Sequence, residues 1–409
     1  RIHKLLRSSE RYFKTDMVYL AKGGSWLLSS QAIVTLLSFI LSIAYANLLP
    51  QTSFGIYKYV LSLIGILAAF TLTGLGTSLV RSVARGNDAT LKSAFWIEFT
   101  WTIGVTFLAG ATALYYFSLD NITLGISLLV AGTLYPLWQG SGLFLSFLNG
   151  KKDFKTKSVY DVGYNIIPFA VILISLYLSD SPVVIITSYF ASYTISALYF
   201  FYKTYKKYPG EESLDPETIV YGKHLSLMNV LGIVATNIDK VLIFHYLGAV
   251  KLAIYAFAIG PVSQISSLLK PLSVLAFPKL SGNDPHTLKN TLPGKLLKLF
   301  LVIIIVIVGY IVLAPLLYKF LFPQYTSSLF YSQLYALVLL FFPQEMLRTS
   351  LVAQGARRAL YAITMTGSIV RIVLLAVLLP LYGILGAVIA LLVHNIISLS
   401  LSYYYFRTL

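Results

Sequence analysis

The chain has 409 residues, 57% of them hydrophobic and 11% charged, and a mean hydropathy of +0.78. A soluble protein of this length could not cover so much apolar surface with polar groups, so a soluble fold is excluded. The net charge of +16 does not indicate nucleic-acid binding, because the basic residues lie at loop ends on one side, where an anionic bilayer face attracts them. The absence of cysteine excludes disulfides and cysteine-ligated metals.

Residues 1–21 are basic and mildly amphipathic, and we expect them to lie along the cytoplasmic membrane surface. Long apolar runs follow, each able to cross a hydrocarbon core of about 30 Å. They are too long and too continuous for barrel strands, so we predict helices. The twelve predicted spans are 22–49, 54–80, 93–117, 123–148, 157–178, 183–203, 223–247, 252–277, 294–322, 329–350, 359–380 and 383–406.

The longest loop, 204–222, divides the chain into an N-terminal lobe (22–203) and a C-terminal lobe (223–409) of six spans each. Within this cytoplasmic linker Asp215-Pro216 is typical of a helix start, with Asp at the cap and Pro at the first helical position. We therefore predict a linker that ends in a new helix.

Lysine and arginine occur at both chain ends and in the gaps after the second, fourth, sixth, eighth and tenth spans. Short loops rich in these residues stay in the cytoplasm, so a multi-pass protein of the cytoplasmic membrane with both termini inside is predicted. The exceptions to the alternation are Lys58, Lys240, Lys251, Lys319 and Arg371. Lys251 and Lys319 fall at the outer rim, so the other three are left as candidate functional cations.

The two halves are predicted to be a repeat, because three weak matches occur in the same order. Leu49–Tyr57 aligns with Leu247–Tyr255, and Asn149–Lys152 aligns with Gln354–Arg358. Spans six and twelve end in TISALYFF and LSLSYYYF. Each half has six spans and starts inside, so the repeats are parallel and related by an axis along the membrane normal. Such an architecture suits alternating access through a central cavity.

Several segments resemble the polysaccharide (O-antigen type) flippases of the MOP exporter superfamily. AKGGSWLLSSQAIVTLLSF and YANLLPQTSFGIY resemble that family's first two helices, and TGLGTSLVRSVAR resembles its first cytoplasmic loop. FLNGKKDF resembles the end of its fourth helix, and NIDKVLIFHYLGAVKLAIYAFA its seventh and eighth helices. The resemblance covers nearly the whole chain, and the order of the loose motifs carries most of its weight.

The resemblance implies an all-α integral membrane fold, with two parallel six-helix bundles in the V shape of MOP and MATE transporters. It also implies export of lipid-linked oligosaccharides across the cytoplasmic membrane. Relatives of that family include multidrug (MATE) exporters and peptidoglycan-precursor flippases. The latter usually carry two extra helices, which the predicted spans do not include.

Charged residues at bilayer depth are costly and usually mark function. Arg371, midway along span eleven, is predicted to be a cavity cation for an anionic headgroup; a structural hydrogen bond or buried ion pair is the alternative. Lys240 is predicted to contact phosphate, with the polar Asn237 nearby, although a salt bridge between lobes explains it equally well. Lys58 is predicted to line the outer mouth, and snorkelling is its alternative explanation.

Asp239 is the best acidic candidate for coupling to a Na⁺ or H⁺ gradient, and no other cofactor is expected. An inner gate of ion pairs is predicted from five residues, Arg81, Arg85, Glu98, Glu345 and Arg348. Glu345 and Arg348 stand at i and i+3 and therefore share a helix face. Positive-inside anchoring of these side chains is the simpler interpretation of the two.

The remaining polar residues do not indicate one particular function. Asp161 and Asn165, at i and i+4, belong either to helix packing or to a polar cavity wall. His245 and His394 lack partners at metal-ligand spacing, so no metal site is expected.

The balance of charge decides among the candidate functions. Lys58, Lys240 and Arg371 outnumber Asp239, and a cationic cavity attracts an anionic ligand such as a pyrophosphate headgroup or acidic glycan. We predict a flippase for lipid-linked oligosaccharide, not an enzyme, working as a monomer without nucleic acid. Its expected partners are the glycan substrate, the bilayer, and polymerase or ligase proteins of the same pathway.

A MATE-like cation-coupled drug antiporter is the alternative, and it needs acidic residues in the N-terminal cavity. Only Glu98 and Asp161 are available there, both toward the inside. A membrane glycosyltransferase needs a sizeable outer loop, whereas the predicted outer loops have only a few residues. No phosphate-cradling G-x-x-x-x-G-K-[ST] motif is present, so direct use of ATP is not expected.

Overall fold

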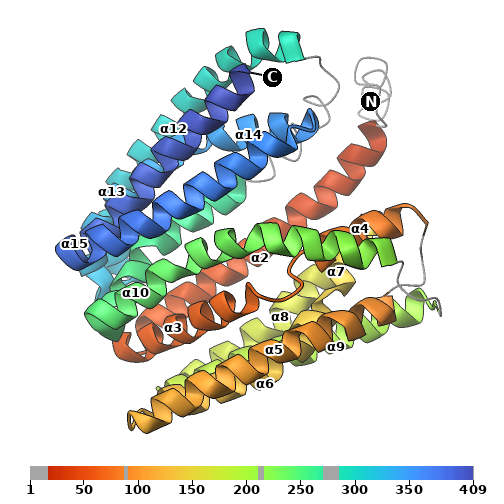
Figure 1. The fold of residues 1–409 in the computed structure, drawn as a ribbon. Helices are drawn as coiled ribbons and strands as arrows, with labels where there is room; N and C mark the ends of the chain where they lie inside the picture. The colour runs from red at the N-terminus through yellow and green to blue at the C-terminus, as the bar shows by residue number, and fades with distance from the viewer. Residues whose placement is uncertain (1–16, 87–90, 211–215, 270–284, 409) are drawn as a thin grey trace. The chain divides into compact units, whose positions relative to one another are not determined.

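The computed structural model describes residues 17–86, 91–210, 216–269 and 285–408, and every element in these ranges is helical (Figure 1). The predicted amphipathic segment 1–21 lies almost wholly outside the described residues, as does 211–215 of the predicted linker. The α-helices are α2 (Met17–Leu48), α3 (Gln51–Ala68), α4 (Leu75–Ala84), α5 (Leu91–Ser118), α6 (Ile122–Gly142), α7 (Phe144–Gly150), α8 (Phe154–Leu178), α9 (Pro182–Lys207), α10 (Pro216–Leu269), α12 (Pro285–Leu321), α13 (Leu329–Tyr335), α14 (Pro343–Ala353) and α15 (Arg357–Arg407). Two 3-10 helices, η1 (Pro323–Ser328) and η2 (Ala336–Phe341), adjoin α13.

Nine helical stretches of the described chain are long and apolar enough to cross a membrane. Two of them, α10 and α15, are each broken by a glycine with left-handed backbone, Gly248 (φ 84°) and Gly383 (φ 59°). Only glycine adopts such angles without strain. Both glycines fall at predicted span boundaries, so each stretch comprises two spans. With α3 and α4 as the second span, the helices match the twelve predicted spans.

Span two differs from its prediction as one continuous helix over 54–80. It consists of α3 and α4, separated by an irregular turn at residues 69–74 (Figure 1). The Gly74 N–H donates to the Ser226 hydroxyl (2.9 Å), and the Thr71 hydroxyl donates to the Ala68 carbonyl (2.8 Å). Irregular backbone inside a membrane protein persists only where protein groups satisfy it. Hydropathy along the chain cannot detect a partner on α10, so the continuous-helix prediction was wrong here.

The chain forms two compact units, one of residues Leu36–Ala253 and one of Arg1–Thr35 with Ile254–Leu409. The first unit contains the end of α2 from Leu36, α3 to α9, and α10 as far as Ala253. The second contains the start of α2, the rest of α10, and α12 to α15. The predicted lobes divide at 204–222 instead. They are groups of helices expected to move together during transport, and that division stays a prediction.

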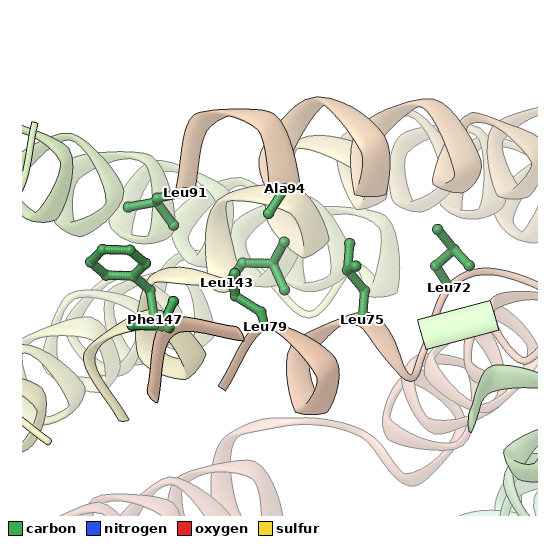
Figure 2. Close-up of a cluster of buried hydrophobic side chains, with 8 residues drawn as sticks. Leu72, Leu75, Leu79, Leu91, Ala94, Leu143 and Phe147 are labelled. Atoms are coloured by element: carbon green, nitrogen blue, oxygen red, sulfur yellow. The ribbon is translucent and has the colours of Figure 1, made fainter. Parts of the chain in front are cut away.

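One end of the first unit is built around a hydrophobic cluster, most of which Figure 2 shows: Leu72, Leu75, Leu79, Val83, Leu91, Ala94, Leu143 and Phe147. Tyr208 and Ile219 pack against it. The ends of α4, α7 and α9 and the start of α10 therefore meet here, which brings three predicted cytoplasmic loops together. At the other end of α9, the Ser53 hydroxyl donates to the Asp180 carbonyl (2.8 Å), which joins two predicted outer loops. This arrangement agrees with the predicted alternation.

Large apolar side chains cover the outer surfaces of the helices. On α12, Ile305, Val312 and Phe320 are 72%, 66% and 69% exposed. Exposure of long apolar helix faces is unfavourable in water and expected in lipid. The fold is therefore that of a multi-pass membrane protein, and the predicted all-α class is confirmed.

Asp153 joins α7, α8 and α9 at the end of the first unit near the hydrophobic cluster. Its Oδ1 accepts a hydrogen bond from the Thr156 N–H (3.2 Å) and caps α8, while its Oδ2 accepts from Lys207 Nζ (2.7 Å) and from the Tyr208 hydroxyl (2.8 Å). Burial alone would raise the pKa of Asp153, but these hydrogen bonds outweigh it and hold the pKa well below its usual range.

Asp153→Asn is expected to lower the stability at pH 7 by about 1 kcal/mol, the usual effect of losing a helix cap or a half-exposed ion pair. A depressed folded-state pKa adds stability above the unfolded pKa of about 3.9, and that stability is lost as pH falls toward the folded value. The difference in Tm between wild type and variant should therefore narrow below about pH 4. Thermal unfolding in detergent at several pH values measures it. Asp120→Asn, in an exposed loop, is the control, and its Tm should differ little from that of wild type at every pH. A Tm difference between Asp153→Asn and wild type that stays the same at every pH would contradict the ion-pair account.

Candidate functional site

Helix α10 runs antiparallel to α3 and α4, and glycines allow the backbones to approach closely. A Cβ on Gly55 would overlap the Ala249 carbonyl, and one on Gly74 would lie 2.6 Å from the Gly222 carbonyl oxygen. Between them, a Cβ on Gly65 would lie 3.2 Å from the Asn237 amide. We call this contact the α3/α4–α10 seam. Its register brings the predicted residues of span seven against those of span two.

At one end of the seam, Lys240 pairs with its sequence neighbour Asp239. Lys240 Nζ is 3.2 Å from Asp239 Oδ1 and donates to the Thr236 carbonyl (2.9 Å). The Asp239 side chain is only 1% exposed and that of Lys240 is 21% exposed. Adjacent helical residues point about 100° apart and need not pair, but the long lysine side chain folds back along the helix to reach the carboxylate.

Lys58 of α3 lies within electrostatic reach of Lys240 across the seam. Its ammonium is 5.2 Å from the Phe54 ring centroid and 5.3 Å from that of Tyr57, which are cation–π distances. The structure thus brings together three predicted residues, Lys58, Lys240 and Asp239. Asp239 pairs with Lys240, and Lys58 adds a second basic group on the facing helix.

Asn237 lies one helical turn from this site. Its amide donates to the Ile233 carbonyl (3.0 Å), and the side chain packs against Gly65. The predicted polar neighbour of Lys240 is therefore part of the seam.

In the second unit, Arg371 belongs to a basic group on α14 and α15. His394 lies within electrostatic reach of both Arg371 and Arg348, and its Nδ1 is 2.8 Å from the Gly367 carbonyl oxygen. Arg348 donates to the Thr364 hydroxyl (3.2 Å). Glu345 is exposed, and the ion pairs found among the described residues do not join it to Arg348. The structure therefore brings Arg348 close to Arg371's group rather than to its predicted partner.

At the other end of the seam, Arg81 and Arg85 of α4 face α10. Both guanidinium groups lie 3.6 Å from the carboxylate of Glu217. The guanidinium of Arg81 also lies 4.7 Å from the Tyr221 ring centroid. Sequence reasoning did not single out Glu217 as a site residue. Arg81 and Arg85, at i and i+4, share a helix face and favour an acidic partner there. The register of α10 decides which acidic residue that is.

Glu98, a predicted gate residue, is buried on α5 instead of pairing with Arg81. It is 1% exposed, and among the described residues neither carboxylate oxygen has a partner at hydrogen-bonding distance. The polar side chain that interacts with it is Gln139 of α6. An ionised carboxylate with so little compensation is costly to bury, and such a group is normally protonated.

Glu98→Gln should therefore keep the shape of the side chain and change the stability by less than about 1 kcal/mol, because the amide matches an uncharged carboxyl group in both charge and shape. Glu98→Ala should lower the stability, since it opens a cavity. Fluorescence-detected thermal unfolding in detergent compares the two. A large loss of stability in Glu98→Gln would show that the charged carboxylate holds the fold together.

The comparisons with known proteins concern both sequence and fold. The model of a family described as polysaccharide biosynthesis protein matches residues 20–283. The fold resembles that of the lipid II flippase MurJ in its inward closed conformation, with a TM-score of 0.70 and 15% identity over 93% of this chain and 87% of that one. No curated protein matches the sequence.

Two further solved structures share the fold. An outward-facing multidrug resistance MATE transporter of the MOP superfamily has a TM-score of 0.68 and 14% identity over 95% of each chain. A MOP superfamily transporter from Pyrococcus furiosus, for which a reversed polarity of the binding pocket suggests a different function, has a TM-score of 0.65 and 14% identity over 95% of each chain. At such identities the likeness concerns the fold alone.

Proposed function

Because the chain belongs to the polysaccharide biosynthesis protein family, we propose that it flips lipid-linked oligosaccharide across the cytoplasmic membrane. Family and fold together make it a transporter of the MOP superfamily and not an enzyme, as the sequence motifs predicted. The substrate that we propose is a glycan on a polyprenyl pyrophosphate. The observation that carries this proposal is the presence of basic groups near one another, Lys58 and Lys240 in one unit and, around His394, Arg371 and Arg348 in the other.

The sign of these charges favours an anionic substrate. Charges within membrane spans are costly and are retained where a function needs them. Basic groups in a site shielded from water attract a pyrophosphate strongly, because the low dielectric strengthens the attraction. The glycan would cross past these basic groups while the lipid tail stays in the bilayer. A pump for cationic drugs would need the opposite sign of charge.

The Asp239–Lys240 pair supports a way to couple transport to an ion gradient. While the pair is intact, the carboxylate holds the Lys240 ammonium. Protonation of Asp239, or Na⁺ bound to it, would release that ammonium for the pyrophosphate. The protein would then expose its basic site alternately to the two sides of the membrane, with the ion and the substrate acting on the same lysine.

Export of defined glycans in a host that lacks its own flippase tests the proposal. The wild-type chain should restore export of at least one lipid-linked glycan of known structure. Arg371→Ala should keep expression but abolish export, and Arg371→Lys should retain part of it. Lys319→Ala, on an exposed position of α12, is the matched control and should export normally. Full export by Arg371→Ala would remove Arg371 from the site, and efflux of cationic drugs without glycan export would favour the antiporter.

The proposed orientation is open to a direct test, because the chain contains no cysteine. A cysteine introduced at the exposed Lys152 is expected to react with a membrane-impermeant maleimide only after the membrane is opened. A cysteine at the exposed Lys251, the control, should react in intact cells. The reverse pattern would overturn the predicted cytoplasmic termini.

A further inference from the structure

The end of the seam formed by α4 and the start of α10 contains a small pocket of about 20 Å³. The α4 residues that line it stand at i, i+3, i+4 and i+7 and therefore share one helix face: Ser78, Arg81, Ser82 and Arg85. From α10, the pocket is lined by Glu217, Thr218 and Tyr221. Both walls belong to the same compact unit.

The walls of this pocket are held in place by packing. The neighbouring face of α4, with Leu75, Leu79 and Val83, is buried in the hydrophobic cluster of Figure 2. On the other wall, Ser226 of α10 bonds to the Gly74 N–H just before α4 begins. The arginine side chains thus extend from α4, which the hydrophobic cluster holds in place, toward α10, which is joined to the start of α4 by the Gly74–Ser226 hydrogen bond.

The charge in the pocket is suited to a single anion that both arginines reach. Glu217 Oε1 lies 3.6 Å from Arg81 Nη2, and its Oε2 lies 3.6 Å from Arg85 Nη1. These contacts are longer than charge-assisted hydrogen bonds of about 2.7–2.9 Å. The side chain of Glu217 is also 65% exposed, and ion pairs of this kind contribute little to stability. Glu217 therefore occupies the anion position only loosely.

A phosphate group suits the same position better than a carboxylate. It carries more charge and more oxygens, and guanidinium groups bind it through paired hydrogen bonds. Stacking of Arg81 on Tyr221 orients one of the two guanidinium planes. The free volume of about 20 Å³ is far below the roughly 300–1,000 Å³ of sites for drug-sized ligands. A phosphate would therefore have to take the place of the Glu217 carboxylate, and a glycan would not fit.

The surroundings of the pocket are those of the membrane surface. Lys223, just past Tyr221 on α10, lies 5.2 Å from the ring centroid of Trp101, which is 45% exposed. Exposed tryptophan and lysine are typical of the headgroup region. We propose that the α4–α10 pocket binds the phosphate group of a membrane lipid, and that Glu217 occupies its place until the lipid arrives. The lipid is a bilayer phospholipid or a polyprenyl pyrophosphate, and the second source rests on the proposed function.

Binding by the purified full-length protein tests this proposal, with three probes that separate the sources of phosphate. The probes are phosphatidylglycerol, farnesyl pyrophosphate and inorganic pyrophosphate, and the readouts are the shift in Tm and lipid retention in native mass spectrometry. Arg81→Gln and Arg85→Gln should each weaken binding about 10-fold, the effect of losing one charge-assisted hydrogen bond. Glu217→Gln should tighten binding about 3-fold, because it removes the competing anion.

The opposite signs distinguish a binding site from a structural ion pair. If the arginines only anchored α10, Glu217→Gln would weaken the assembly as the arginine variants do. Lys155→Gln removes one exposed positive charge from the predicted cytoplasmic loop after span four and is the matched control, with affinity unchanged within about 2-fold. Elution as a single peak on size exclusion shows that each variant is folded. Wild-type affinity in both arginine variants, or weaker binding by Glu217→Gln, would overturn the proposal.

The binding probes identify the source of the phosphate. Retention of phosphatidylglycerol alone would assign the pocket to bilayer phospholipid, and tighter binding of farnesyl pyrophosphate would assign it to the carrier lipid. Because these measurements use no glycan, failure of the pocket would leave restored glycan export intact. Conversely, pocket binding by a protein that exports no glycan would refute only the proposed function.

Discussion

Lys240→Gln is expected to lower the stability by about 2–3 kcal/mol and to abolish glycan export. Asp239 is 1% exposed and its Oδ1 lies 3.2 Å from the Lys240 ammonium. Removal of one partner from a buried ion pair leaves a charge in a medium of low dielectric, and the usual loss is about 3–5 kcal/mol. Because the Lys240 side chain is still 21% exposed, the expected loss of stability is smaller than in a fully buried pair. Thermal unfolding in detergent and export in the flippase-deficient host measure the two effects.

The double variant Asp239→Asn/Lys240→Gln separates structure from transport. It removes both charges, so the stability should return to within about 1 kcal/mol of wild type. Export should remain absent, because neither the cation for the pyrophosphate nor the acid for coupling is present. Thr236→Ser, which keeps the backbone carbonyl that Lys240 contacts, is a control on the same helix and should export normally. Recovery of export in the double variant would show that the pair serves the fold alone.

Gly55→Val is expected to disrupt the first unit, with a loss of about 3 kcal/mol or failure to fold. Any Cβ at Gly55 overlaps the Ala249 carbonyl, and backbone on both sides leaves no flexible group to give way. Overpacking usually costs about 1–3 kcal/mol, and a β-branched side chain at a backbone contact belongs at the upper end. The measurement is the yield of monodisperse protein together with its Tm. Gly55→Ala should show a smaller loss in the same direction.

Gly104→Val on α5 is the matched control, since a Cβ there meets no atom within 4 Å. Gly104→Ala should raise the stability by up to about 1 kcal/mol, because alanine favours helix over glycine. If Gly55→Val were as stable as Gly104→Val, α10 could not lie against α3 as the structure places it.

Much of the fold could be predicted because the membrane imposes local rules. Hydropathy located the spans, and Gly248 lies in a gap between predicted spans while Gly383 is the first residue of the last one. The alternation of basic loops agrees with the gathering of the α4, α7 and α9 ends around one cluster. Each of these features depends on residues close together in the chain.

The candidate site was predicted only in part. The sequence indicated Lys58, Lys240 and Asp239 by their depth, and the structure brings them together. It did not indicate that Arg81 would face Glu217 while Glu98 lies buried beside Gln139. Both Arg81 and Glu98 lie toward the predicted inner ends of their spans, and hydropathy contains no information about which neighbour each helix face meets.

The sequence by itself determined the number and order of the spans and the cations that lie within them, because burial in lipid selects composition segment by segment. Only the tertiary structure decided the register of α10 against α3 and α4. That register depends on contacts such as Gly74 with Ser226, which are 152 positions apart in the chain, and on glycines that let two backbones touch. The same register sets Lys58 opposite Lys240 and Arg81 opposite Glu217. It thereby creates the pocket that Arg81 and Glu217 line.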